Sequence, residues 1–268
     1  MIKRLDNVKL NIFEKESKLV DIAKSKCRGG VKYFRILKKS LDARDKNNIF
    51  WTYSIAFSDE KQPEKPELDR VSKPRKIAVI GAGPAGLFCA LRLIERGFRP
   101  IIIERGENVD DRKSTCGRFF CQRELDINSN VQFGEGGAGT FSDGKLNTQT
   151  HDGFNKDVLE WFYKFGAPEE VLYLNKPHIG SDKLSPILKN MRAFIEANGG
   201  KYLFNTQFIG LKQKDGAVSS ITLKNVKTCE ETEIYIDDAV LALGHSARDT
   251  FKMLKDNGVE MQRSEFAV

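Results

Sequence analysis

The chain has 268 residues, of which 40% are hydrophobic and 30% charged, and its formal net charge is +7 at pH 7. This composition is typical of a globular protein with a sizeable core. The most apolar stretch, residues 77–91, contains Gly and Pro and is shorter than the roughly 20 residues that a membrane span needs. The first residues lack the apolar segment of a signal peptide, and five scattered cysteines exclude a secreted disulfide framework. We therefore expect a cytoplasmic protein with no membrane partner.

Residues 1–75 carry the whole basic excess, with 19 Lys and Arg against 11 Asp and Glu. Hydrophobic periodicity predicts a strand near 8–12, a helix over 15–26, and strands near 31–37 and 49–57. This β-α-β-β order predicts a small basic α+β domain over residues 1–57, a ferredoxin-like half. Residues 58–75 place three prolines among charged residues, which is typical of an extended linker.

A basic α+β module could bind RNA, with Phe50, Trp51 and Tyr53 as stacking candidates. In the alternative, these aromatic side chains face the core and the lysines only solvate the surface. The second interpretation is favoured because no aromatic-glycine string of the RNP type occurs.

The most informative motif begins with a buried-strand pattern over residues 76–80. It leads into G-x-G-x-x-G at Gly81, Gly83 and Gly86. The first glycine permits a tight turn, the second lets the backbone approach a pyrophosphate, and the third lets a helix pack on the strand. The motif predicts the start of a dinucleotide-binding βαβ unit.

The residues that follow complete this unit. A helix over residues 85–96 directs its N-terminal N–H groups and dipole at phosphates. A second strand over 100–103 ends at Glu104, 18 residues after Gly86. A carboxylate there accepts hydrogen bonds from ribose hydroxyls and disfavours a 2′-phosphate. The pattern thus predicts FAD or NAD at this site, and not NADP.

Residues 133–146 contain five glycines in fourteen positions, too many for a stable helix or strand. Such a loop is expected where the backbone approaches another group closely. Thr140, Ser142 and Lys145 would supply hydroxyl and ammonium donors to phosphates or a flavin ring. The alternative is a flexible surface loop.

Cys116 and Cys121 have the C-x4-C spacing of glutathione-reductase-type redox disulfides. The surrounding residues lack the glycine and proline pattern of such sites, so two small buried residues at the end of a helix are the favoured interpretation. Among the histidines, His178 and His245 could line a flavin site, and His151 is expected in a loop. No grouping has metal-ligand spacing, and no G-x-S-x-G hydrolase motif occurs.

The remaining residues predict a mixed α/β arrangement. Residues 155–165 and 183–198 have the periodicity of amphipathic helices. Strands of a small meander are expected over 201–205, 209–214 and 219–223. A buried strand over 237–244 ends in Gly244, where the backbone could again approach a ligand.

Several of these strings resemble the bacterial family of NAD(FAD)-utilising dehydrogenases, and the similarity covers essentially the whole chain. The strings are residues 81–86 with Glu104, 128–146, 165–182 and 241–250. The resemblance implies FAD, a glutathione-reductase-like Rossmann domain and oxidoreductase chemistry, and it leaves the substrate open. In that fold the backbone near Phe208 passes the adenine. In that family apolar or aromatic residues are expected at positions 116 and 121.

The family continues past the last residue of this sequence, and residues 264–268 resemble part of a strand of the next domain. The resemblance implies that most of a substrate domain, and the segment that closes the flavin domain, lie outside the chain. A genuinely short product is the alternative.

The sequence therefore predicts a basic α+β domain over 1–57, a linker over 58–75, and an incomplete FAD-binding domain over 76–268 with a helical insertion near 151–200. We expect hydride transfer between flavin and an unidentified substrate, with NAD(P)H as the candidate electron donor. The alternatives are a flavin-dependent RNA-modifying protein, which would use the N-terminal module, and a non-catalytic fragment.

His245 and Lys145 are the candidate catalytic residues, which would tune the flavin charge or move a proton. The cofactor-binding candidates are Gly81, Gly83, Pro84, Ala85, Gly86, Glu104, Arg105, Gly136, Gly137, Ala138, Gly139, Thr140, Ser142, Lys145, Phe208 and Gly244. No metal ligands are predicted, and the oligomeric state is left open.

Overall fold

The computed structural model describes residues 1–27, 29–61, 71–72, 75–142, 144–146, 148, 150 and 152–262. The chain divides into two compact units. The first, called unit 1, comprises residues 1–67 and 145–179, and unit 2 comprises residues 68–144 and 180–268. His151, most of the linker expected over 58–75, and the terminal residues 264–268 lie outside the described residues.

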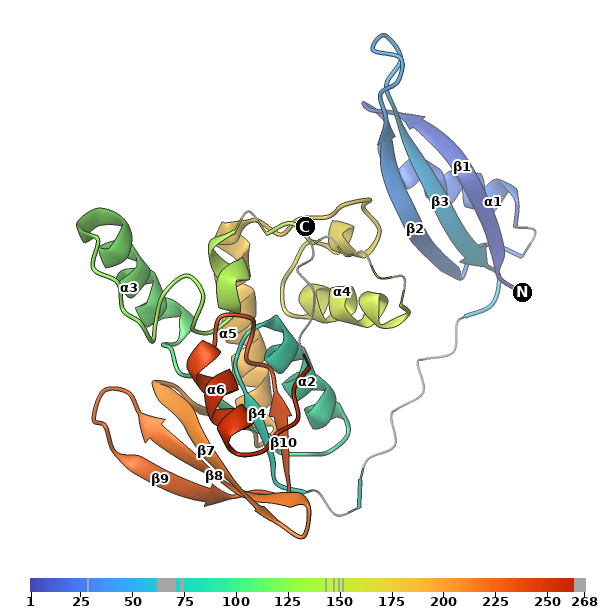
Figure 1. Cartoon of the computed structure of the whole chain (residues 1–268). Helices are drawn as coiled ribbons and strands as arrows, with labels where there is room; N and C mark the ends of the chain where they lie inside the picture. The colour runs from blue at the N-terminus through green and yellow to red at the C-terminus, as the bar shows by residue number, and fades with distance from the viewer. Residues whose placement is uncertain are drawn as a thin grey trace. The chain divides into compact units, whose positions relative to one another are not determined.

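Unit 1 begins with a three-stranded antiparallel sheet in the order β1-β3-β2. Its elements are β1 (Lys3–Asn11), α1 (Ser17–Ser25), β2 (Tyr33–Asp42) and β3 (Phe50–Ser58). Helix α1 covers one face of the sheet (Figure 1), where Leu19 and Ala23 pack among the side chains of Tyr53, Ile55 and Phe57. The β-α-β-β order expected from the sequence is confirmed.

The second part of unit 1 adds to the edge of this sheet. It holds α4 (Phe154–Lys164) and the short 3₁₀ helix η2 (Glu169–Leu172). Lys39 in β2 donates its backbone N–H to Tyr173 O and accepts from Asn175 N, both at 2.8 Å. The helical insertion expected near 151–200 is therefore divided, because α4 lies in unit 1 and the next helix lies in unit 2.

The aromatic side chains of β3 are engaged inside unit 1. Tyr53 is buried in the core, and the ammonium of the nearly buried Lys39 lies 4.6 Å from the ring centroid of Trp51. Lys39 also pairs with Glu16 at 2.6 Å and Glu170 at 3.3 Å. These contacts agree with the interpretation that the aromatic residues serve packing.

Unit 2 is built on a four-stranded parallel sheet in the order β10-β4-β5-β6. Its strands are β4 (Ile77–Ile80), β5 (Ile101–Ile103), β6 (Lys201–Leu203) and β10 (Asp238–Leu241), and its larger helices include α2 (Pro84–Glu95) and α5 (Ser181–Ala197). The register aligns Ile80 with Ile103 and Leu241. The carboxyl ends of β4, β5 and β10 therefore meet at one edge, as in a Rossmann-type sheet.

The two faces of the parallel sheet are covered differently (Figure 1). Ala78 and Ile80 join a core with Phe208, Ile221 and Leu254. The covering elements are an antiparallel meander of β7 (Thr206–Lys214), β8 (Ala217–Asn225) and β9 (Glu231–Tyr235), together with α6 (Arg248–Asp256). Alternation along β4 sends Val79 to the opposite face, where α2 packs. The expected βαβ unit is confirmed. Two of the expected meander strands, at 209–214 and 219–223, lie in β7 and β8. The strand expected over 201–205 is β6 of the parallel sheet, and the third strand of the meander is β9, so this part of the prediction was wrong.

Helix α3 (Val109–Gln122) follows β5, and a short 3₁₀ helix η1 (Gly137–Phe141) lies within the glycine-rich stretch of residues 133–146. Cys116 and Cys121 lie five residues apart within α3; Cys116 is buried, Cys121 is exposed, and both are free thiols. Residues five apart on a helix point about 140° away from each other. The suggested redox pair is therefore not formed, and the interpretation of two buried residues is wrong for Cys121.

Candidate dinucleotide-binding site

The three glycines of the βαβ turn play different structural roles. Gly81 has φ of +107°, and a Cβ there would lie 2.3 Å from the carbonyl oxygen of Ala242. A Cβ on Gly86 would lie 1.9 Å from the Gly81 oxygen, so this glycine allows α2 to start against the loop. A Cβ on Gly83 would meet nothing within 4 Å. Gly83, the N-cap of α2, therefore leaves open space in front of the helix N-terminus.

Glu104 lies directly after β5 and is 6% exposed. Its Oε2 accepts the backbone N–H of Ala82 at 2.8 Å, and its Oε1 accepts from Gly106 at 2.8 Å and Gly134 at 3.1 Å. The carboxylate thus joins the βαβ turn to the glycine-rich stretch. A carboxylate offers about four acceptor positions, so one remains for a ribose hydroxyl. The sequence pattern did not indicate this joining role.

A cavity of about 570 Å³ opens at this edge of unit 2. Its volume lies within the usual range of ligand pockets, roughly 300–1,000 Å³. The predicted site residues that line it are Gly81, Gly83, Pro84, Ala85, Glu104, Arg105, Gly137, Ala138, Phe208, Gly244 and His245. They come from the segments directly after β4, β5 and β10, from the first turn of α2, from η1 and from β7, so the fold brings together positions far apart in the sequence.

One wall of the cavity is held by a polar contact to α6. The guanidinium of Arg105 lies 4.8 Å from the ring centroid of Phe133 and pairs with Asp249. Asp249 also accepts a hydrogen bond from the Gln207 side chain at 2.9 Å. Arg105, Phe133 and Gln207 all line the cavity, and their arrangement is fixed by a carboxylate that sequence reasoning did not single out.

The glycine-rich stretch packs against other residues of unit 2 more closely than the sequence indicated. A Cβ on Gly136 would lie 2.4 Å from both the Leu188 side chain and the Thr140 hydroxyl. Thr140 is buried and donates to the carbonyl of Glu135 at 3.2 Å, and the Ser142 hydroxyl donates to Gly139 O at 2.8 Å. The sequence predicted that these two hydroxyl groups donate to phosphates. In this structure both donate to backbone carbonyl oxygens instead.

Two buried charged residues, one in α3 and one in the glycine-rich stretch itself, were not identified from the sequence. Arg112 of α3 and Glu135 are both fully buried. Glu135 accepts from the backbone N–H of Val109 at 2.8 Å and from Arg192 at 2.9 Å. Burial raises the pKa of the Glu135 carboxyl above its ordinary value. Arg112 lies in none of the sequence motifs, and Glu135 lies in the glycine-rich stretch but was not singled out there. Charged residues are expected at the surface, so nothing in the sequence indicated that these two are buried.

The two candidate catalytic residues have different surroundings. His245 follows Gly244 after β10 and lines the cavity. Lys145 belongs to unit 1, where it forms an isolated antiparallel bridge with His178. Gly139, Thr140 and Ser142 lie in or beside η1. Among the described residues, no group of three or more His, Cys, Asp and Glu side chains could hold a metal ion.

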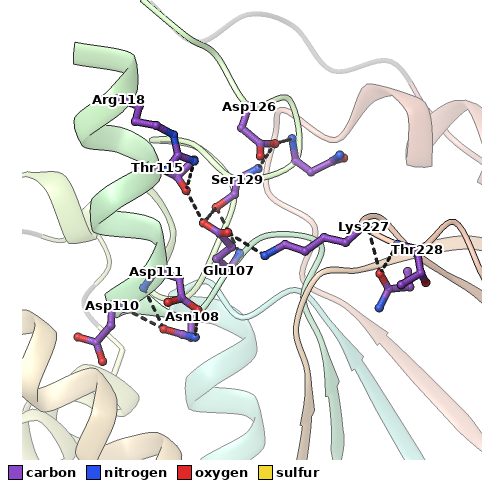
Figure 2. Close-up of polar contacts among 12 residues, drawn as sticks. Glu107, Asn108, Asp110, Asp111, Thr115, Arg118, Asp126, Ser129, Lys227 and Thr228 are labelled. Carbon is purple, nitrogen blue, oxygen red and sulfur yellow. Dashed lines mark hydrogen bonds and ion pairs between the residues drawn. The ribbon is translucent and has the colours of Figure 1, made fainter. Parts of the chain in front are cut away.

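A polar cluster around Glu107 joins three parts of unit 2 (Figure 2). The Glu107 carboxylate accepts from Thr115 at 2.6 Å, Ser129 at 3.1 Å and Lys227 at 3.1 Å. These donors come from α3, from the turn before the glycine-rich stretch, and from the β8–β9 connection. Burial raises the pKa of Glu107, but the hydrogen bonds outweigh burial and hold that pKa below its ordinary value.

Because its pKa is lowered in the folded state, the contribution of Glu107 to the free energy of unfolding depends on pH in the acidic range. A carboxyl with a lowered folded-state pKa stabilises the protein above its ordinary pKa of 4.5, and this contribution is lost as pH falls through the folded value. We expect Glu107→Gln to lower the free energy of unfolding at pH 7 by roughly 1–3 kcal/mol. The difference from the unsubstituted protein should shrink at pH 4 and below. Urea unfolding at several pH values measures it, and a difference independent of pH would contradict this assignment.

Sequence comparison identifies the same segment as the geometry. Residues 76–115 match the FAD binding domain family. The matched range contains β4, the glycine turn, α2, β5 and Glu104. The match confirms the predicted flavoprotein character and FAD as the predicted cofactor.

Two curated proteins and one solved structure are similar to this chain over different lengths. An uncharacterized protein of Clostridium beijerinckii is 37% identical over 296 aligned residues, which cover 100% of this chain and 53% of that protein. An L-amino acid oxidase of Cerastes cerastes is 29% identical over 91 residues, covering 25% of this chain and 18% of its own. The crystal structure of THI4 from Thermovibrio ammonificans gives a TM-score of 0.44 at 17% identity, covering 70% of this chain and 64% of that one.

The chain thus spans about half the length of the Clostridium relative. None of the described helices combines the length and the apolar character that a bilayer crossing requires. A segment of the chain matches the FAD binding domain family, and it folds into a βαβ unit whose glycine turn opens into a ligand-sized cavity.

Proposed function

We propose that unit 2 binds FAD and that the chain is the flavin-binding part of an FAD-dependent oxidoreductase. The observation that carries this proposal is the open space in front of Gly83, at the N-terminus of α2, inside a segment that matches the FAD binding domain family. Backbone N–H groups and the helix dipole favour an anion there. The cavity extends from this point to Glu104 and Phe208.

In this proposal, different residues along the cavity bind different parts of FAD. The turn from Gly81 to Gly86 would hold the pyrophosphate, and Glu104 would accept from the ribose of the adenosine half. The backbone at Phe208 would contact the adenine. Gly244 would lie near the flavin ring, with the segment from Gly136 to Ser142 covering the pyrophosphate or flavin side.

FAD, when bound, supplies hydride transfer, and the protein provides binding, orientation and exclusion of water. In this proposal His245 tunes the charge next to the ring or moves a proton. The substrate is a small molecule whose identity is open, and NAD(P)H is the proposed electron donor. The substrate-facing residues are proposed to lie in the part of longer relatives that this chain does not span.

The test is a visible absorption spectrum of the purified protein, followed by identification of the released chromophore. We expect flavin absorption and release of FAD. A colourless protein should become coloured when it is incubated with FAD and freed of excess cofactor. A protein that stays colourless, and whose melting temperature rises with NAD but not with FAD, would replace this proposal with an NAD site. A protein that responds to neither would favour a fragment that does not bind cofactor.

A further inference from the structure

Arg112 is the largest side chain among those that are fully buried. Its guanidinium donates to four oxygens of one short stretch, residues 130–140. Nε donates to Asn130 O at 2.9 Å, Nη2 to Val131 O at 2.9 Å, and Nη1 to Glu135 O at 2.7 Å and the Thr140 hydroxyl at 3.3 Å. One side chain of α3 therefore satisfies three loop carbonyls that have no strand to pair with.

The acceptors of this guanidinium are all uncharged, although carboxylates are the usual partners of a buried arginine. Its remaining face lies 4.9 Å from the ring centroid of Phe141. A planar guanidinium with five donors in a fixed fork suits several carbonyls at once, and a lysine ammonium does not. The contacts therefore depend on the shape of the arginine as well as on its charge.

One glycine of the stretch leaves room for the Arg112 side chain. Gly134 has φ of +120°, and a Cβ there would lie 2.4 Å from Cδ of Arg112. The N–H of the same Gly134 reaches the Glu104 carboxylate at 3.1 Å. The stretch is thus held between Arg112 on its inner side and Glu104 at the cavity, and Phe133, Gly134, Gly137 and Ala138 line that cavity.

We propose that Arg112 is a positioning residue, which holds residues 130–140 in the conformation that forms the cavity wall for the dinucleotide. This inference rests on the proposed FAD binding. Arg112 does not line the cavity, so it acts through the loop. A loop fixed before binding loses less conformational freedom when the ligand arrives, and the affinity is correspondingly higher.

The test compares Arg112→Met and Arg112→Lys in the full chain. We expect both variants to raise the Kd of FAD by about tenfold or more, because neither side chain can bond all three carbonyls. Amide hydrogen exchange should accelerate in residues 130–137 of the ligand-free variants while β4 and β5 stay protected. The control is Lys212→Met, which removes an exposed partner of Glu233 in the meander and should leave the Kd of FAD within about twofold.

Two results would overturn the proposal. If Arg112→Lys binds FAD with the unchanged Kd, the fork geometry does not matter. If the Kd rises without faster exchange in residues 130–137, Arg112 does not act through the loop. Should neither Arg112 variant fold, Thr140→Val replaces them, since it removes a single acceptor of the guanidinium; an unchanged Kd there would also refute the inference. Absence of FAD binding by the unsubstituted protein would instead refute the proposed function.

Discussion

Gly83→Asp should abolish FAD binding while leaving the melting temperature of the ligand-free protein unchanged or slightly raised. Gly83 is the N-cap of α2, with φ of −70° and ψ of −178°, and Asp is among the preferred N-cap residues in that conformation. The new side chain would enter space in which a Cβ meets no atom within 4 Å. There it would face the FAD pyrophosphate, and two negative charges about 4 Å apart repel by about 4 kcal/mol at an effective dielectric constant near 20. Isothermal titration with FAD and thermal unfolding without it give the two quantities.

Gly83→Asn separates charge from volume, since Asn has nearly the same size and is an equally good N-cap. We expect Asn to weaken FAD binding less than Asp does. Gly86→Ala provides the opposite contrast, because its Cβ would lie 1.9 Å from the Gly81 oxygen and should lower the melting temperature of the ligand-free protein. If Gly83→Asp bound FAD with the Kd of the unsubstituted protein, the pyrophosphate could not lie at this turn.

Glu104→Gln is expected to destabilise the protein even when no cofactor is present. The carboxylate accepts three backbone N–H groups, from Ala82, Gly106 and Gly134, whereas a carboxamide turns one acceptor into a donor. A lost charge-assisted hydrogen bond next to an unsatisfied buried N–H costs about 3 kcal/mol, which corresponds to a fall in melting temperature of roughly 10 °C for a chain of this size. Thermal unfolding without FAD measures the effect.

The matched control is Asp256→Asn, which removes an exposed partner of Lys252 at 2.6 Å and should change stability by less than about 0.5 kcal/mol. A Glu104→Gln protein that melts like the unsubstituted one, and loses only FAD affinity, would make Glu104 a ribose ligand without a role in joining the two loops.

Local patterns in the sequence predicted the βαβ unit well. The strand at 76–80, the glycine turn, the helix and the second strand follow from hydrophobic periodicity and from glycine at positions where a Cβ would collide. The β-α-β-β module and the β7–β8 pair of the meander were predictable for the same reason, whereas β6 was wrongly expected in the meander. Most of the residues expected around the cavity line it, because the carboxyl ends of parallel strands meet at one edge.

In the glycine-rich stretch, the local sequence pattern did not predict which groups the glycines contact. Its composition correctly indicated that it forms no α-helix or strand, although residues 137–141 form a short 3₁₀ helix. The close approach that the glycines permit is made to Arg112, Leu188 and Thr140. The sequence could not indicate this, because the contact partners lie up to about fifty residues away and have no motif. The same holds for the division of the expected insertion, since the contact between residues 173–175 and β2 depends on long-range pairing.

The sequence by itself determined the dinucleotide turn, the acidic residue after β5 and the class of cofactor, because these depend on backbone sterics and charge within about thirty residues. Only the tertiary structure decided what the buried charges do. Glu104 joins two loops, Arg112 holds three carbonyls, and Glu107 fastens three elements. A buried charge is stable only where several distant groups converge to satisfy it, and that convergence exists only in the folded chain.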